Sequence, residues 1–156
     1  MGFFNKTKTI VSPATGKVIL VSDVGDNVFS EKVLGDGIAV IPEENEIVSP
    51  CDGVIMQIAH TKHAICFETQ DGLEILLHLG MDTVNLKGEG FECFAREGEK
   101  VKAGQKLMEM DINFIKSKGF SVESPCIITN MDKLKTSEFF TGNAKRGETT
   151  VIKYKV

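Results

Sequence analysis

Residues 61–80 read Thr61-Lys62-His63-Ala64-Ile65-Cys66-Phe67-Glu68-Thr69-Gln70-Asp71-Gly72-Leu73-Glu74-Ile75-Leu76-Leu77-His78-Leu79-Gly80. The runs on either side of Asp71-Gly72 are rich in β-branched, aromatic and leucine side chains, which favour strands. Asp-Gly is a pair that a two-residue type I′ turn prefers, because both central residues of that turn take positive φ. The stretch therefore predicts a β-hairpin.

The same hairpin predicts a pair of histidines. With a two-residue turn at Asp71-Gly72, Ile65 lies opposite His78, and His63 shares a face with both because side chains alternate along a strand. The two imidazoles are then diagonal neighbours, with backbones about 7–8 Å apart. The third histidine, His60, is an odd number of residues from His63 and is expected in a loop or on the opposite face.

Composition limits the class of protein. The chain has 156 residues, suited to one domain, with 42% apolar and 26% charged residues as in ordinary globular proteins. Its net charge is −4 and its lysines are scattered, so no basic surface for nucleic acid is indicated. No signal peptide or membrane-spanning apolar run is present. The four cysteines form no Cys-x-x-Cys, which favours reduced, mostly buried thiols in a cytoplasmic protein.

The sequence predicts a short N-terminal arm followed by a single domain. Residues 1–10 are expected to form a flexible arm, and residues 11–156 a single domain. Phe3 and Phe4 lie beside Lys6 and Lys8 in this arm, which would allow weak contact with an anionic membrane surface. A frayed terminus is the simpler alternative.

Turn signals rich in glycine recur every 8–15 residues or so and separate short apolar runs, the pattern of an all-β antiparallel sandwich or barrel. Ser12-Pro13, Ser49-Pro50 and Ser124-Pro125 suggest a duplicated β-motif. Helix signals are few. Asp111 is expected to cap a short helix over Ile112–Lys118 that ends at Gly119, and Asn130–Leu134 to add a helical turn.

A histidine pair can accept a phosphoryl group, bind a metal ion or act as an acid–base couple. Two imidazolium charges about 4 Å apart would cost on the order of 4 kcal/mol at an effective dielectric of 20, so at least one ring stays neutral. Ile65, Phe67 and Leu76 are expected to desolvate the pair. Catalytic zinc usually takes three protein ligands; Asp82 could be a third, but no recognisable motif completes the set, so a zinc-dependent hydrolase is disfavoured.

The segment from His78 to Phe91, His78-Leu79-Gly80-Met81-Asp82-Thr83-Val84-Asn85-Leu86-Lys87-Gly88-Glu89-Gly90-Phe91, resembles the phosphorylation-site signature of the glucose-family IIA component of the bacterial sugar phosphotransferase system. Thr61-Lys62-His63-Ala64 resembles the family's second-histidine segment, and the similarity extends over nearly the whole chain. The resemblance implies an antiparallel β-sandwich with two adjacent histidines and a role as phosphotransferase component.

The resemblance also implies roles for individual residues. His78 matches the nucleophile that accepts a phosphoryl group from phospho-HPr on Nε2 and passes it to a cysteine of the sugar-specific IIB domain. His63 matches the partner that hydrogen-bonds the phosphate, and Thr61 the hydroxyl that orients His63. Partner-binding positions at the rim of the site are matched by the acidic Asp26 and Asp82 and by the apolar Val28 and Phe29.

Several features stay open at the level of sequence. Ala59 stands where the family often has a phenylalanine, so partner preference could differ. The resemblance implies no required cofactor, although His63 and His78 could share a zinc ion with a partner. Regulated permeases or kinases are further possible partners. The alternatives are a regulatory binding module of the same fold and, with less support, the zinc-dependent hydrolase.

Overall fold

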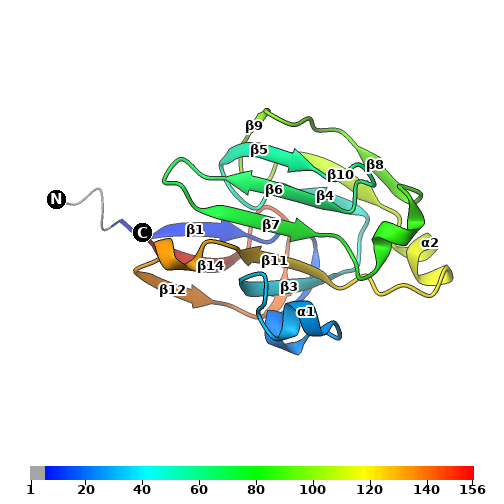
Figure 1. Ribbon diagram of the computed structural model, residues 1–156, viewed down its shortest axis with the longest axis horizontal. Coiled ribbons are helices and arrows are strands. Elements are labelled where there is room, and N and C mark those ends of the chain that lie inside the picture. The colour runs from blue at the N-terminus through cyan, green and yellow to red at the C-terminus, as the bar shows by residue number, and fades with distance from the viewer. Residues whose placement is uncertain (1–5) are drawn as a thin grey trace.

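The computed structural model describes residues 6–156 as antiparallel strands in one eight-stranded sheet and two three-stranded sheets (Figure 1). The large sheet has the order β13-β2-β3-β11-β7-β6-β5-β9, and the small ones β1-β14-β12 and β4-β10-β8. Strand bounds are β1 Lys8–Val11, β2 Gly16–Leu20, β3 Asp36–Pro42, β4 Glu46–Val48, β5 Gly53–Ile58, β6 Ala64–Glu68, β7 Glu74–His78, β8 Phe91–Cys93, β9 Lys100–Val101, β10 Lys106–Met110, β11 Ser124–Ile128, β12 Thr136–Phe139, β13 Gly142–Ala144 and β14 Thr150–Lys155. The predicted all-β antiparallel fold is confirmed.

The duplicated motif appears as an approximate twofold relation between two halves of the fold. The order of the large sheet reads β13-β2-β3-β11 from one edge and β9-β5-β6-β7 from the other, so the halves meet at β11 and β7. Hydrogen bonds repeat across the halves: the N–H of Val48 donates to Pro13 at 2.8 Å, and that of Val11 to Pro50 at 2.9 Å. The repeat therefore covers Ser12-Pro13 and Ser49-Pro50.

Ser124-Pro125 is not a third copy of this motif. The hydroxyls of Ser12 and Ser49 donate to carbonyls two residues ahead, those of Ala14 and Cys51. The hydroxyl of Ser124 instead donates backwards, to Val122 at 2.8 Å.

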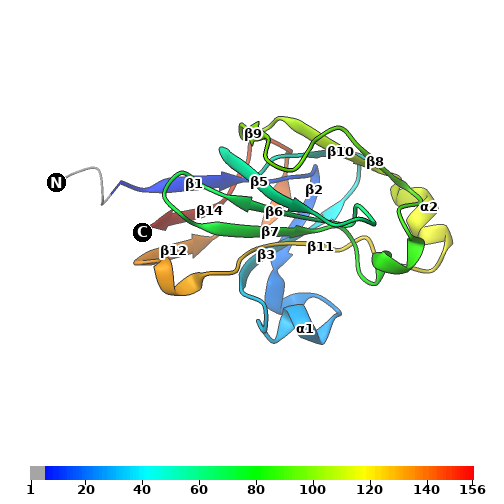
Figure 2. The ribbon, with the colours of Figure 1, turned by 45° about the horizontal axis from the view of Figure 1, so that its top comes forward.

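The main core lies between the large sheet and the two small ones, and a second, smaller core covers the opposite face of the large sheet. Alternation along β7 shows the two faces, because Ile75 and Leu77 belong to the main core while Leu76 packs on the second. Helix α1 (Asn27–Ser30) and the 3₁₀ helix η2 (Val21–Asp23) cover this outer face. Figure 2 shows α1 standing off the sheet beside β3 and β11.

The hairpin is present, but its predicted register is wrong by one residue. Ala64, not Ile65, lies opposite His78, and Glu68 opposite Glu74, so residues 69–73 form a five-residue loop. Gly72 has φ +84°, whereas Asp71 does not take the positive φ that a type I′ turn requires. The side chain of Thr69 explains the longer loop: its hydroxyl accepts from the N–H of Leu73 at 2.9 Å and contacts Asp71.

The predicted helical segments are confirmed. Asp111 caps α2 (Ile112–Ser117) by accepting from the N–H of Phe114 at 3.1 Å, and Gly119 follows at φ +87°. The predicted turn after Asn130 is the 3₁₀ helix η4 (Met131–Lys133).

The boundary expected after residue 10 is wrong, because residues 8–10 belong to β1 and Ile10 is fully buried. The predicted membrane contact through Phe3 and Phe4 falls outside the described residues. Across residues 6–156, none of the helices has the length and apolar character to span a membrane.

All four thiols are free; Cys51 and Cys126 are buried and Cys66 and Cys93 partly so. Burial raises the pKa of Cys51 to about 12 and also raises that of Cys126. These two thiols therefore stay protonated and act as small core side chains.

Candidate functional site

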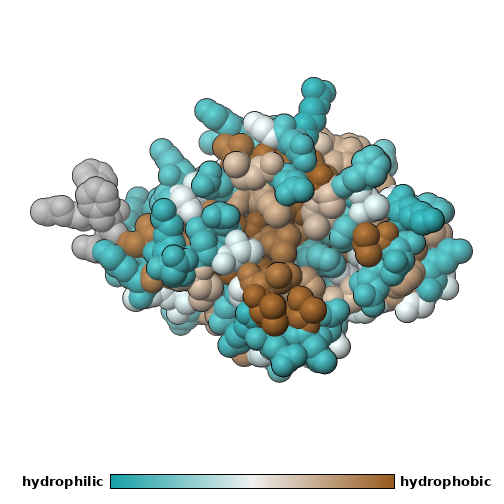
Figure 3. All heavy atoms as spheres, viewed as in Figure 1, coloured by the Kyte–Doolittle hydropathy of each residue, from teal (hydrophilic) through white to brown (hydrophobic). Residues whose placement is uncertain are grey.

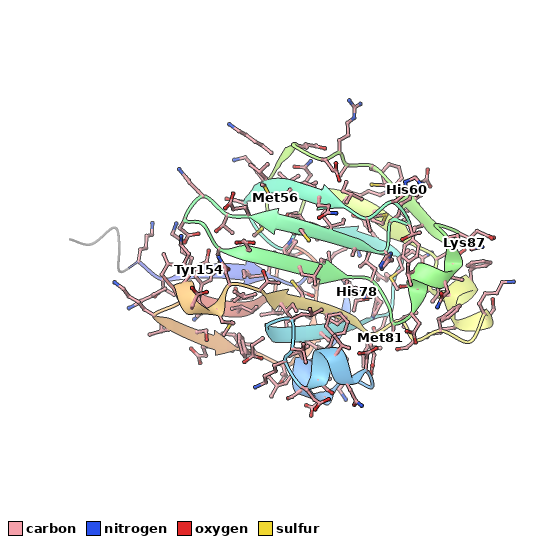
Figure 4. The ribbon with its side chains drawn as sticks, in the orientation of Figure 1. Met56, His60, His78, Met81, Lys87 and Tyr154 are labelled. Atoms are coloured by element: carbon pink, nitrogen blue, oxygen red, sulfur yellow. The ribbon has the colours of Figure 1, made fainter. Side chains whose placement is uncertain are left out.

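Two of the three histidine rings meet on the outer face of the large sheet. The ring centroids of His63 and His78 lie 5.1 Å apart with an interplanar angle of 78°, an edge-to-face arrangement. Figure 4 shows His78 between β7 and the segment that carries α1. His60 is exposed and lies in the β5–β6 turn, which also carries His63. The predicted pair and the separate position of His60 are both present.

The pair does not arise from strand alternation as predicted. In the observed register His63 lies just before β6, and continued alternation would turn its side chain toward the main core. The strand instead ends there: Lys62 takes the left-handed conformation at φ +63°, and its N–H donates to Ala59 at 2.8 Å. This turn releases His63 from the alternation and lets its ring reach His78.

His78 ends β7 and points to the outer face, as Leu76 does two residues earlier. Its Nδ1 lies 2.7 Å from the carbonyl oxygen of Gly80. A carbonyl can only accept, so Nδ1 carries the proton and the lone pair of the neutral ring is on Nε2. The backbone thus selects Nε2 as the nucleophilic atom.

His63 is held by a hydroxyl rather than a carbonyl. Its Nδ1 lies 2.6 Å from Oγ1 of Thr61, as the predicted orienting role requires. A hydroxyl can donate or accept, so this contact is compatible with either neutral tautomer and with the protonated ring.

Both rings favour the neutral form. Burial lowers the pKa of His63, and the neighbouring His78 lowers it further. Burial also lowers the pKa of His78, against the opposing effects of the Gly80 carbonyl and the carboxylates of Asp26 and Asp82. At neutral pH the lone pair of His78 is therefore available.

Two of the three predicted desolvating neighbours lie elsewhere, whereas Leu76 is on the same face of β7 as His78. Ile65 and Phe67 are almost fully buried in the main core, on the other face of β6. Phe29 of α1 takes their place: its ring centroid lies 5.0 Å from that of His78 at an angle of 57°. Phe29 is only 5% exposed, so it forms part of the wall of the site rather than an exposed rim.

An apolar surface lies beside the histidines. Four side chains are exposed on α1, on the segment that follows it and on the 3₁₀ helix η3 (Thr83–Leu86): Val28, Val33, Leu34 and Val84. Figure 3 shows an apolar patch over α1 and the adjoining sheet, surrounded by hydrophilic side chains. Such a patch is typical of a surface that binds another protein.

Asp26 and Asp82 affect both the local backbone and the pKa of His78. Asp26 caps α1, its side chain accepting from the N–H of Val28 at 2.9 Å. Asp82 is exposed and takes the left-handed conformation at φ +60° immediately before η3. Both carboxylates raise the pKa of His78, so both act on this ring.

Three features of the site were not predicted: the Gly80 carbonyl, the short helix α1, and the exposed Val33 and Leu34. An Asp-Asn-Val sequence at residues 26–28 and a glycine two residues after His78 are weak signals for the first two. Val33 and Leu34 lie between Lys32 and Gly35, which both take positive φ. In the sequence, two apolar residues just before a glycine are the signal that could have indicated an exposed apolar turn.

Within residues 6–156, no group of three or more histidine, cysteine, aspartate or glutamate side chains is arranged to hold a metal ion. The pair alone supplies two ligands, short of the three that a catalytic zinc site takes from its protein. The arrangement fits a nucleophilic imidazole with a hydrogen-bonding neighbour better than a complete metal centre.

Residues 8–134 match the family model described as phosphoenolpyruvate-dependent sugar phosphotransferase system, EIIA 1. The chain belongs to this family. A glucose-specific EIIA component of Bacillus anthracis is 44% identical over 154 residues, which cover 98% of this chain and 93% of the relative. The corresponding protein of Haemophilus influenzae is 44% identical over 146 residues, 94% of this chain and 88% of that protein.

A solved structure gives the same result. Glucose permease IIA from Mycoplasma capricolum superposes with a TM-score of 0.88 at 39% identity, covering 97% of this chain and 99% of the other. The chain is therefore a phosphocarrier component of the sugar phosphotransferase system. In the glucoside-specific EIICBA component of Staphylococcus carnosus, 43% identical over 143 residues, the match covers 92% of this chain but only 21% of the larger protein.

Proposed function

We propose that His78 accepts a phosphoryl group from phospho-HPr on Nε2 and passes it to a cysteine of a sugar-specific IIB domain. The observation that carries the proposal is the engagement of both Nδ1 atoms, by Gly80 for His78 and by Thr61 for His63. This engagement leaves two Nε2 atoms for the phosphoryl group, on rings whose centroids are 5.1 Å apart.

In the first step the Nε2 lone pair of His78 forms an N–P bond while the P–N bond of the donor phosphohistidine breaks. His78 keeps its Nδ1 proton, so its ring becomes cationic as the donor ring becomes neutral. The Gly80 carbonyl and the carboxylates of Asp26 and Asp82, which all favour the charged ring, stabilise this product. In the second step an S–P bond to a cysteine thiolate forms, the N–P bond breaks, and His78 returns to neutral.

His63 assists by donating a hydrogen bond to a phosphoryl oxygen. For this its Nε2 must carry a proton, and the Thr61 hydroxyl permits it by donating to Nδ1. Each of the two steps transfers a phosphoryl group between good nucleophiles, so positioning and desolvation supply most of the catalysis.

Val28, Val33, Leu34 and Val84 would provide the docking surface for both partners. Donor and acceptor must visit the same site in turn, which favours a small, weak interface of under about 1,200 Å². Asp26 and Asp82 would meet basic side chains of the partner. The fused Staphylococcus carnosus protein supports a IIB partner, since its name places IIA, IIB and IIC components in one chain.

We extend the proposal to the location of the protein, to zinc binding and to the choice between a carrier and a regulatory module. The phosphotransferase function favours a cytoplasmic location. A zinc ion bound by His63 and His78 would need further ligands from a partner, because the described residues offer no third one. The intact pair and Thr61 favour a working carrier over a purely regulatory module.

The test is phosphorylation by phosphoenolpyruvate, enzyme I and HPr, followed by intact mass. Wild type, His63→Gln and the exposed-histidine control His60→Gln are expected to gain one phosphoryl group, with His63→Gln slower. His78→Gln is expected to gain none. A phosphoryl group on His78→Gln, or none on wild type, would contradict the proposal.

A further inference from the structure

The Gly80 carbonyl that selects the His78 tautomer belongs to a tightly held loop, residues 79–81. Five backbone N–H and C=O groups of this loop are hydrogen-bonded, including the Gly80 carbonyl on Nδ1 of His78. The N–H of Leu79 donates to the His63 carbonyl at 2.6 Å, and the hydroxyl of Thr83 donates to the Leu79 carbonyl at 2.6 Å. The N–H of Met81 donates to the Ser121 carbonyl at 3.0 Å.

The remaining N–H of the loop, that of Gly80, donates to the hydroxyl oxygen of Ser124 at 3.2 Å. The same hydroxyl donates to the Val122 carbonyl at 2.8 Å, which leaves its oxygen lone pairs directed to Gly80. Ser124 is 1% exposed and begins the central strand β11, opposite Val40 of β3. The loop is thus fixed to a strand whose five residues are all buried.

Gly80 is the residue in this loop most able to move if that bond is lost. It takes φ +81°, a conformation that glycine adopts without steric cost, and so its peptide units rotate more freely than those of other residues. The Gly80 N–H belongs to the Leu79–Gly80 peptide and the Gly80 carbonyl to the Gly80–Met81 peptide, so loss of the Ser124 bond acts on the carbonyl through the Gly80 Cα. A shift of that Cα would carry the carbonyl away from Nδ1 of His78.

We propose that Ser124 is a positioning residue for His78: its buried hydroxyl fixes the Leu79–Gly80 peptide and thereby the Gly80 Cα, from which the following peptide directs its carbonyl to Nδ1 and keeps the proton there. Without the hydroxyl, the buried Gly80 N–H lacks a partner, and the Leu79–Gly80 peptide turns toward another acceptor, which displaces the Gly80 Cα and the carbonyl that follows it. The His78 ring then distributes its proton between both nitrogens, and a fraction of the molecules lose the Nε2 lone pair.

The chain contains a matched control. Ser49 is also a buried serine before a proline, 0% exposed, with its hydroxyl donating to the Cys51 carbonyl at 2.7 Å. It lies in the motif that links the two halves of the fold rather than in the loop after His78. Ser49→Ala therefore removes an equivalent hydroxyl without touching Gly80.

The experiment is ¹⁵N NMR of the ring nitrogens in protein labelled at histidine, at neutral pH and without phosphorylation. Wild type and Ser49→Ala should show His78 with its proton on Nδ1. Ser124→Ala should shift the tautomer ratio of His78 toward Nε2–H by about tenfold, the equivalent of about 1.4 kcal/mol. Should Ser124→Ala fail to fold, Ser124→Cys, with a weak thiol acceptor of similar size, should shift the ratio in the same direction.

An unchanged ratio in the folded Ser124 variant, or an equal shift in Ser49→Ala, would overturn the inference. The tautomer needs no phosphoryl donor, so this result is independent of the proposed function. Slower phosphoryl acceptance by Ser124→Ala does rest on that function. If wild type accepted no phosphoryl group while the tautomer still shifted, the proposed function alone would fail.

Discussion

At the scale of single residues, the two histidines differ in what holds Nδ1. The Gly80 carbonyl on His78 permits one neutral tautomer, while the Thr61 hydroxyl on His63 permits both. A nucleophile needs a permanent lone pair, and a hydrogen-bond donor to phosphate needs a proton on the same atom. The difference therefore gives a physical reason for His78 as the acceptor and His63 as its assistant.

The lowered pKa values of both rings predict how stability depends on pH. In the unfolded chain an imidazole has a pKa near 6.5, above that of His63 or His78 in the folded protein. Below a pH of about 6.5 the unfolded state therefore binds more protons than the folded state. As the pH is lowered further, the free energy of unfolding falls until the pH is below the pKa values of both histidines in the folded protein. Urea unfolding of wild type from pH 7.5 to 5 should show this loss.

The variant His78→Gln should lose less stability than wild type over the same pH range, because it removes one of the two rings that resist protonation. His60→Gln, which removes an exposed imidazole outside the pair, serves as control. Equal pH dependence in wild type and His78→Gln would show that burial of the His78 ring does not disfavour its charge.

At the scale of elements, the short helix α1 connects the site to the stability of the fold. Asp26 caps α1, Phe29 of the same helix packs on His78, and the N–H of Gly25 donates to Glu123 at 3.1 Å. A four-residue helix is too short to be stable alone, so its cap and its contacts determine whether it forms.

Asp26→Ala should therefore lower the free energy of unfolding by about 1 kcal/mol, as is typical for loss of an N-cap, and also slow phosphoryl acceptance. Asp26→Asn should keep the cap and the stability but remove the charge that raises the pKa of His78. Chemical denaturation and the rate of phosphorylation by HPr measure the two effects separately.

Asp111→Ala is the matched control, because the Asp111 side chain also caps a short helix by accepting from a backbone N–H in its first turn. It should lower stability by a similar amount and leave the phosphorylation rate unchanged. If Asp26→Ala and Asp111→Ala had the same effect on that rate, the role of α1 at the site would be refuted.

The hairpin shows what local sequence rules can and cannot predict. Alternating apolar residues and Asp71-Gly72 identified the two strands, yet the register was wrong because the Thr69 side chain stabilises a longer loop. The prediction of the histidine pair was still correct, because the left-handed turn at Lys62 lets the His63 ring reach His78 despite the shifted register. Residue propensities do not indicate that a side chain will hydrogen-bond within its own loop, or that a lysine will take the left-handed conformation.

At the scale of the whole molecule, the site lies where equivalent connections of the two halves meet. In one half the β2–β3 connection is long and brings Asp26 and Phe29; in the other the β5–β6 connection is short and brings Thr61 and His63. His78 lies between them on β7, beside the line where the halves join. The duplication was predictable from the Ser-Pro repeats, but the unequal connections that form the site were not.

The central claim is that Nε2 of His78 carries the phosphoryl group. The most direct test is NMR of the ¹⁵N-histidine-labelled protein after phosphorylation through HPr, detecting the one-bond coupling between phosphorus and a ring nitrogen. We predict a single coupling, to Nε2 of His78, with the proton still on Nδ1. A coupling to Nδ1, or to either nitrogen of His63, would contradict the account.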